Sequence, residues 1–455
     1  MTRMETNESY LTYQSGRESN ARSYPRRIPI ALREGKGIVV KDVEGKSYYD
    51  CLSGAGTLAL GHHHPAVTEA MQDVWKSGVP LHTLDLTSPV KEAFMKELLA
   101  FLPASFARDA RIQFCGPTGA DAVEAAVKLV KTATGRTGMM SFQGGYHGMT
   151  HGALSLTGNI KPKQALGSMN DVQFLPYPYA YRCPFGLGGE CCDETAAHYI
   201  AHMLQDPESG VCKPAGMIME MVQGEGGVIP APNRFAARIR QMTKEHGIPL
   251  LIDEVQTGFG RTGKRFAFEH ADIVPDVLIL SKAIGGSLPL SVVVYHKSLD
   301  VWQSGAHAGT FRGNVLAMAA GTATMKVIQQ EKLEHHAEQM GLRFESHFHT
   351  LRQTVTSVGD VRVKGLMIGL EIVNPDQPAD RLGHFPADPK MAADIQKMCI
   401  ESGLIVELGG RHGSVLRLLP PLIVTPEQVD DICTILEKAI HRCERNKRTS
   451  VMQEV

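Results

Sequence analysis

The sequence has no long apolar run and almost no net charge. Nowhere do 18 apolar residues follow one another, so we expect no membrane-spanning helix. Residues 1–27 are polar and lack the apolar core of a secretory signal. With 47 Lys and Arg against 48 Asp and Glu, the formal charge of −1 offers nucleic acid or an anionic membrane no general attraction.

Regularly spaced cysteines are missing as well. The nine cysteines are an odd number without a repeating spacing, which is typical of a reduced, cytoplasmic chain. Cys183, Cys191, Cys192 and Cys212 lie near His198 in the sequence, but they lack the CxxC pairs of structural zinc sites. We therefore predict no metal site, and we find no internal repeat or low-complexity linker.

Between residues 110 and 300, short apolar runs alternate with longer runs of helical spacing. Residues 234–247 have such a spacing, a basic last turn and a terminal Gly. This order predicts an α/β fold, a doubly wound sheet that binds its ligands at the carboxyl ends of its strands. The predicted strands are buried and parallel, and they span 215–222, 248–254, 276–281 and 290–297.

Both ends of the chain differ from this central part. Strand-like runs at 361–373 and 413–424 predict a smaller α+β unit, and we expect the first 80 residues to pack with it. The predicted division is a large domain at 81–325 and a small domain made of 1–80 and 326–455.

One glycine-rich segment matches two nucleotide motifs by letter only. Residues 258–263 fit GxGxxG, but residues 253–256 separate them from the preceding strand, so they cannot open a helix directly. Extended to Lys264 the segment approaches a Walker A loop, yet Arg265 stands where a Ser or Thr would hold magnesium. We therefore keep a nucleotide-binding or non-enzymatic α/β protein only as an alternative to an enzyme.

Charged groups stand at the ends of three predicted strands: Glu220, Asp253 and Lys282. Lys282 is either a lysine that reaches solvent from the strand edge or a desolvated amine that forms a Schiff base. Asp253 alone fits a helix cap or loop anchor. A lysine and an acid in one crevice, however, are the pair that pyridoxal phosphate needs for its aldehyde and its ring nitrogen.

Two loops suit the rest of such a cofactor. In CGPTGAD, Thr118 and Asp121 form a helix start signal, and the following run contains a Glu124–Lys128 pair at helical spacing. The free amides of that helix start favour a phosphate, although an ordinary capped helix has the same signal. In the loop 144–148, the Tyr146 ring either stacks on a flat ring or is an ordinary aromatic.

These motifs together resemble the class III aminotransferases, which are fold-type I pyridoxal-phosphate enzymes. LLIDEVQTGFGRTG (250–263) and LILSKAIGGSLPLS (278–291) are similar to the family's signature, and the resemblance extends from about residue 30 to 440. It implies a large, mainly parallel sheet domain with a smaller α+β domain, and a homodimer with shared active sites.

The resemblance also implies a role for each site residue. Lys282 would form the Schiff base and move the proton, and Asp253 would pair with the pyridine nitrogen. Gln256 would bond the ring hydroxyl, and Val255 would pack on the ring face opposite Tyr146. The remaining predicted cofactor contacts are His147, Glu220, the phosphate-binding Thr118, Gly119 and Ala120, and Thr310, which would reach across the dimer interface.

Substrate binding is implied by two further segments. Residues 220–227 resemble the family's EPxQGE segment, and Arg417 resembles its C-terminal arginine, which clamps an α-carboxylate. Glu225 would mask Arg417 when an ω-amino donor binds.

Met149 marks a departure, because relatives that act on ornithine or GABA have Arg at that position of the aromatic loop. With residues 81–91 and 176–190, it resembles the group of this family that uses diaminobutyrate and 2-oxoglutarate. The implied reaction moves the 4-amino group of L-2,4-diaminobutyrate to 2-oxoglutarate, reversibly and by a ping-pong route. The products would be L-aspartate 4-semialdehyde and L-glutamate. The alternative is another ω-aminotransferase, with ornithine, GABA or a polyamine as donor.

Overall fold

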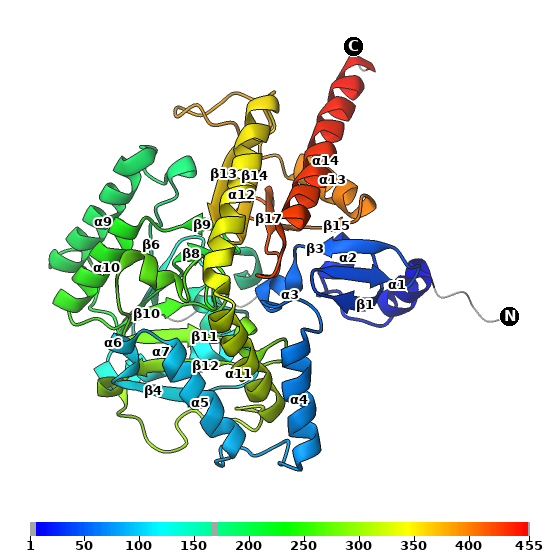
Figure 1. The fold of residues 1–455 in the computed structure, drawn as a ribbon. Coiled ribbons are helices and arrows are strands. Elements are labelled where there is room, and N and C mark those ends of the chain that lie inside the picture. The colour runs from blue at the N-terminus through cyan, green and yellow to red at the C-terminus, as the bar shows by residue number, and fades with distance from the viewer. Residues whose placement is uncertain (1–5, 165–170, 454–455) are drawn as a thin grey trace.

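A seven-stranded sheet forms the centre of the computed structural model, which describes residues 6–164 and 171–453 (Figure 1). Its strand order is β4-β12-β11-β10-β7-β5-β6. The predicted α/β fold is therefore confirmed. The strands are β4 (Ala110–Phe114), β5 (Met139–Phe142), β6 (Val172–Leu175), β7 (Gly216–Met219), β10 (Leu250–Asp253), β11 (Val277–Leu280) and β12 (Val292–His296).

Alternating side chains of the central strands are buried in two separate cores. Leu251 and Ile279 pack on one face, with the apolar side of α7 (Gly119–Thr134). Ile252 and Leu278 point to the other face and belong to the larger core. Because both faces of the sheet are covered, these strands are apolar along their whole length. The apolar runs that were expected to be strands do contain strands, which are somewhat shorter than predicted.

The prediction that 290–297 is a parallel strand is wrong. In β12, Val292 pairs with Leu280 and Tyr295 pairs with Val277, so the strand runs antiparallel to β11. Only residues 281–291 join the two strands, and they contain no more than a 3₁₀ turn, η4 (Lys282–Gly285). A parallel return needs a crossover of a dozen or more residues, so the chain turns back instead.

Two smaller four-stranded sheets combine distant parts of the chain. One has the order β1-β2-β3-β15, in which β15, near the C-terminus, pairs in parallel with β3, near the N-terminus. The other has the order β13-β14-β17-β16. Their strands are β1 (Leu32–Lys36), β2 (Val39–Asp42), β3 (Ser47–Asp50), β13 (Val358–Lys364), β14 (Met367–Ile372), β15 (Leu404–Ile405), β16 (Glu407–Gly409) and β17 (Val415–Leu418), and a separate pair is β8 (Val222–Gln223) and β9 (Ile229–Pro230).

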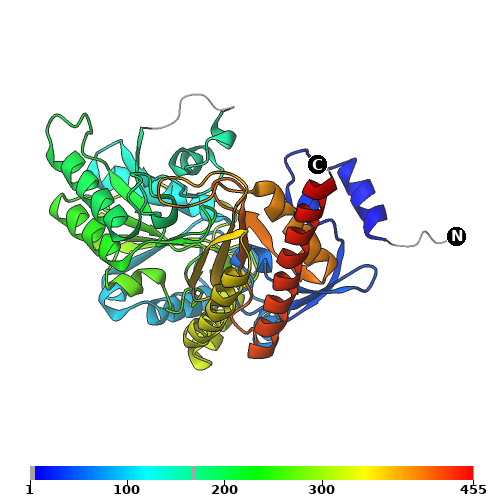
Figure 2. The ribbon, with the colours of Figure 1, turned by 90° about the horizontal axis from the view of Figure 1, so that it is seen from above.

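Helices surround these sheets (Figures 1 and 2). The helix expected at 234–247 is present as α10 (Asn233–Glu245). Helices α4 (Pro65–Ser77) and α5 (Pro89–Phe101) pack on α11 (Val315–Gln330), and α12 (Leu333–Thr354) contacts both β13 and α14 (Pro426–Gln453). The other helices are α1 (Asn7–Ser15), α2 (Tyr24–Arg27), α3 (Ser53–Gly56), α6 (Ala104–Ala107), α8 (His151–Leu156), α9 (Gly189–Gln205) and α13 (Pro389–Glu401).

The expected Glu124–Lys128 pair is absent among the described contacts. Glu124 Oε1 accepts hydrogen bonds from the amides of Gly152 and Ala153 at 2.8 and 3.1 Å, and Lys128 donates to the Ala306 carbonyl oxygen at 2.9 Å. The first amides of α8 lack partners within their own helix, and a carboxylate satisfies them better than it satisfies an exposed lysine.

The segment with the two nucleotide motifs has a structural role. Arg261 is buried, and its Nη1 donates to the carbonyl oxygens of Leu366 and Pro420. It thus connects the region after β10 to the β13–β14 turn.

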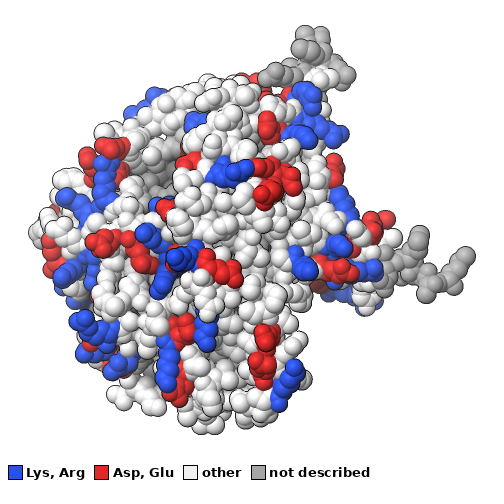
Figure 3. Space-filling view, viewed as in Figure 1, with Lys and Arg blue, Asp and Glu red and all other residues white. Residues whose placement is uncertain are grey.

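The surface matches the balanced composition. Acidic and basic side chains are interspersed on the face that Figure 3 shows. Among the described helices, none combines the length and the apolar character that a membrane crossing requires.

Candidate active site

The carboxyl ends of β7, β10 and β11 meet at one edge of the central sheet, beside a cavity of about 510 Å³. Eleven of the thirteen predicted site residues line it, whereas Thr310 and Arg417 do not. The lining residues are Thr118, Gly119, Ala120, Tyr146, His147, Glu220, Glu225, Asp253, Val255, Gln256 and Lys282. The structure therefore brings them together, while the roles assigned to them stay predictions.

Lys282 stands at the turn between β11 and η4. Its φ of +53° is in the left-handed region, which a residue with a side chain adopts only when its surroundings impose it. Burial lowers the pKa of the Lys282 amine, and the charges of Glu225 and Asp253 oppose that shift. Within the described part of the chain, Lys282 forms no hydrogen bond or ion pair, so its amine is available as a nucleophile.

Asp253, the last residue of β10, is held by two neighbours. Its Oδ2 lies 2.8 Å from Nδ1 of His147, and both side chains are buried. Its Oδ1 accepts a hydrogen bond from the Val255 amide at 3.1 Å. Burial disfavours the charged form of His147, but the hydrogen bond and charge of Asp253 outweigh burial and raise the pKa of His147. His147 therefore orients Asp253, a function that the sequence did not specify.

Glu220 follows β7 and fixes the aromatic loop. Its carboxylate accepts hydrogen bonds from the amides of Tyr146 at 2.9 Å and Gly224 at 3.2 Å. Burial raises the pKa of Glu220 to about 7, and His147 opposes the rise. The Tyr146 ring, 38% exposed, lies at the cavity.

The start of α7 offers amides to an anion. The side chain of Thr118 caps the helix by accepting from the Asp121 amide, and the amides of Gly119 and Ala120 have no partner among the described residues. A Cβ added at Gly119 would lie 3.1 Å from the Val255 side chain, so the chain is closely packed behind this turn.

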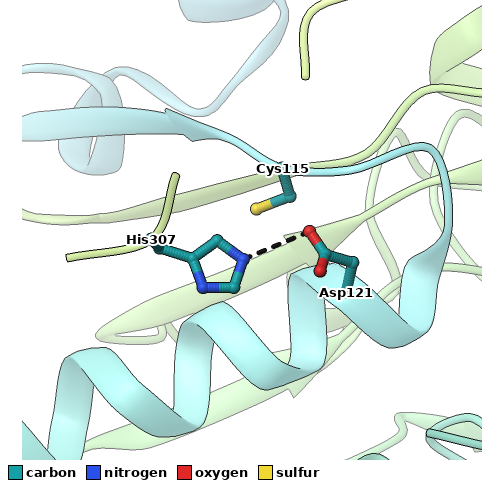
Figure 4. A group of neighbouring side chains, drawn as sticks. All are labelled: Cys115, Asp121 and His307. Atoms are coloured by element: carbon teal, nitrogen blue, oxygen red, sulfur yellow. Dashed lines mark hydrogen bonds and ion pairs between the residues drawn. The ribbon is translucent and has the colours of Figure 1, made fainter. Parts of the chain in front are cut away.

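A cluster of Cys115, Asp121 and His307 supports this turn from behind (Figure 4). Asp121 Oδ2 accepts from the Gly116 amide at 2.5 Å and contacts His307 Nε2 at 3.1 Å. Burial raises the pKa of the Cys115 thiol, which favours its neutral form. The cluster therefore serves to tie the loop that leads to Thr310, which is exposed, to the start of α7.

Only one of the two polar atoms of the Gln256 side-chain amide has a hydrogen-bond partner among the described residues. Its Nε2 donates to the Ala55 carbonyl oxygen at 3.1 Å. Its buried Oε1 has no partner among the described residues, so it can accept a hydrogen bond from a ligand hydroxyl.

Arg417 lies fully buried behind Glu225, between two carboxylates. Its Nη2 is 2.9 Å from Glu225 Oε1 and 2.7 Å from Glu407 Oε2. Its buried Nε and Nη1 find no acceptor among the described residues, which suits a carboxylate ligand. Glu407 Oε1 accepts a hydrogen bond from the Tyr24 hydroxyl at 3.0 Å. Sequence reasoning missed Glu407 and Tyr24, since neither stands in a motif.

Comparison with known proteins agrees with this geometry. The family model of class-III aminotransferases matches residues 20–440. The chain is 53% identical to a diaminobutyrate–2-oxoglutarate aminotransferase of Rhizobium meliloti, over 96% of this chain and 94% of the relative. It is 48% identical to one of Haemophilus influenzae, over 96% and 95%. A PLP-bound amine transaminase from an uncultivated Pseudomonas species has a TM-score of 0.83 at 27% identity, covering 94% of this chain and 98% of that one.

We predict that Glu220→Gln flattens the pH dependence of unfolding. The folded state holds the Glu220 proton more tightly than the unfolded chain, so this stabilisation, on the order of 3 kcal/mol, is present below about pH 4.5 and lost as pH rises through about 7. Thermal unfolding midpoints between pH 4 and 8 measure it. Burial also raises the pKa of Glu254 to about 7, so part of the pH dependence of the unfolding midpoint remains in every variant. The exposed Glu194→Gln should behave as wild type, and an unchanged slope in Glu220→Gln contradicts the assignment.

Proposed function

The chain belongs to the class-III aminotransferase family, and we propose that it moves the 4-amino group of L-2,4-diaminobutyrate to 2-oxoglutarate. The products are L-aspartate 4-semialdehyde and L-glutamate, and the reaction is a reversible ping-pong transfer. The observation that carries this proposal is the 53% identity to a relative of that name over nearly the whole chain. Glu225 at the cavity and Arg417 behind it add a chemical reason, because they suit the ammonium and carboxylate groups of the two substrates.

Pyridoxal phosphate is the cofactor of this family, and the residues of the cavity fit it. Its phosphate would be held by Thr118 and the first amides of α7, and its ring hydroxyl by the free Oε1 of Gln256. When bound, the cofactor supplies an aldehyde that accepts an amine and a ring that withdraws electrons from the reacting carbon. We propose that Lys282 forms the covalent link.

The protein's own groups then handle the protons. Asp253, fixed by His147, would pair with the ring nitrogen, because a buried carboxylate favours a protonated ring. The Lys282 amine would take the proton from the substrate carbon that bears nitrogen and hold it for the return step. The lowered pKa of Lys282 suits both steps: it makes the neutral amine available to take a proton and makes the ammonium so formed a better proton donor.

The far end of the cavity has to accept two kinds of substrate. Glu225 lines the cavity and can bind an ammonium group of the donor. When Glu225 turns away, Arg417 can clamp the α-carboxylate of glutamate or 2-oxoglutarate through nitrogens that now have no acceptor among the described residues. Met149 lies in the cavity lining, where ornithine- and GABA-type relatives have Arg, which supports a donor other than GABA.

We also propose that the enzyme is a cytoplasmic homodimer. All nine cysteines are free, which suits a reducing compartment. Leu84, Leu86 and Phe311 are 51%, 69% and 69% exposed and lie around the Arg312–Asp85 ion pair, which suits a subunit interface. Thr310, next to Phe311, would reach the phosphate of the partner's site across this interface.

The division into domains is also a proposal: 81–325 as the large domain, with 1–80 and 326–455 as the small one. The pairing of β15 with β3 supports it, because that sheet contains strands from both ends of the chain.

A donor panel tests the proposed reaction. With 2-oxoglutarate as acceptor, we expect kcat/KM for L-2,4-diaminobutyrate to exceed that for ornithine, GABA and putrescine by at least about tenfold. Glutamate formation measures turnover. Strong turnover of GABA without turnover of diaminobutyrate would rule out the proposed donor.

Lys282→Ala tests the covalent link. We expect the purified variant to lose the yellow absorbance of the wild type and its activity to fall by about 100- to 10,000-fold or more, because both the amine and the proton carrier are gone. Lys326→Ala, an exposed lysine on α11, is the matched control and should keep both. A yellow and active Lys282→Ala would contradict the assignment.

Phe311→Asp tests the dimer. A charge placed in an apolar interface should convert the dimer to monomers in sedimentation and weaken retention of the cofactor. Leu342→Asp changes a side chain on α12 that is 54% exposed and should leave the mass unchanged. A monomeric wild type, or a dimeric Phe311→Asp, would contradict the proposed interface.

A further inference from the structure

We propose that Glu407 determines the choice of donor: it shares Arg417 with Glu225 and so keeps the far end of the cavity net anionic for a distal ammonium group. The inference rests on the proposed function, and it assigns to Glu407 a positioning role rather than contact with the reacting atoms.

Glu407 lies where β16 pairs with β17. It is the cross-strand partner of Arg417 in this antiparallel pair, so the two side chains share one face of the sheet. Its side chain is 6% exposed, and its Oε2 lies 2.7 Å from Arg417 Nη2. Water therefore screens this ion pair little.

Two neighbours of Glu407, Arg417 and Tyr24, favour its carboxylate form. Burial and the charge of Glu225 raise the pKa of Glu407, and Arg417 and the hydrogen bond from Tyr24 oppose that rise. The partner at Oε2 is a guanidinium, which only donates, and the Tyr24 hydroxyl donates to Oε1 at 3.0 Å. Oε2 forms no hydrogen bond with the described residues, but it lies at ion-pair distance from a guanidinium that is always charged, and this contact favours the carboxylate.

The charge count at this corner is uneven. Two carboxylates, Glu225 and Glu407, face the single guanidinium of Arg417, which leaves an excess of one negative charge. Lys282 and Arg27 also act on Glu225. Burial lowers the pKa of the Lys282 amine and so favours its neutral form. The side chain of Arg27 is exposed and donates to the Leu408 carbonyl oxygen at 3.4 Å. Water screens the charge of Arg27 much more than that of the buried Glu407.

This excess distinguishes the donors. When the 4-amine of diaminobutyrate is at Lys282, its distal end carries an ammonium beside a carboxylate, whereas GABA has only a carboxylate there. Since Glu407 already neutralises Arg417, the charge of Glu225 is left for the ammonium. The same charge opposes a distal carboxylate and, in the second half-reaction, the binding of 2-oxoglutarate.

Glu407→Gln therefore has opposite effects on the two half-reactions. We expect KM for diaminobutyrate to rise roughly tenfold, while KM for 2-oxoglutarate stays the same or falls, with kcat changed by no more than about twofold. The kcat/KM preference for diaminobutyrate over GABA should fall by about tenfold or more. Glu407→Asp keeps the charge and should restore most of the preference, and Glu194→Gln is the surface control.

The outcomes separate this inference from the proposed function. A wild type that does not use diaminobutyrate removes the proposed function itself. If the wild type uses it and Glu407→Gln keeps the wild-type preference with an unchanged cofactor spectrum, the inference is overturned. It is also overturned if the KM values for donor and acceptor rise together, as expected from a merely structural role. Should Glu407→Gln fail to fold, Tyr24→Phe, which removes only the second donor to Glu407, must shift the preference in the same direction, or the inference is wrong.

Discussion

The register of three parallel strands determines where the three charged groups at the sheet edge, Glu220, Asp253 and Lys282, lie. Ile252 pairs with Met219 of β7, and Asp253 pairs with Ile279 of β11, so Glu220 follows β7 beside Asp253, and Lys282 follows the end of β11 at the same edge of the sheet. The register is held by apolar residues on both faces, in two separate cores. A slip of one residue would send each of these side chains to the opposite face. The positions of these three charged groups therefore depend on the apolar packing of the strands that carry them.

Buried charge is distributed unequally around the cavity. Asp253 has His147, and Arg417 has two carboxylates, whereas Lys282 has no such partner among the described residues. Paired charges keep their ionised forms in a buried site, and an unpaired amine tends to lose its proton. The site thus combines a paired carboxylate, a paired guanidinium and an unpaired amine. An overall charge of −1 gives no hint of this local arrangement.

Sequence reasoning located the parts of the site that are local in the chain. Asp253 and Lys282 each end an apolar run, and Thr118 begins a helix, so short windows identify them. Predictions from the sequence failed where a strand direction or a side-chain contact depends on residues outside the local segment. The direction of β12 follows from the short connection after β11, and Glu124 binds amides of α8 rather than the nearby lysine. Glu407 is paired by a cross-strand register and by Tyr24, which lies 383 residues away.

The most direct test of the account follows one nitrogen atom. L-2,4-Diaminobutyrate labelled with ¹⁵N at position 4 is incubated with the enzyme and 2-oxoglutarate, and the glutamate formed is examined by NMR or mass spectrometry. The account predicts that the glutamate carries the label, whereas diaminobutyrate labelled at position 2 gives unlabelled glutamate. Label arriving from position 2, or no transfer from either, would contradict it.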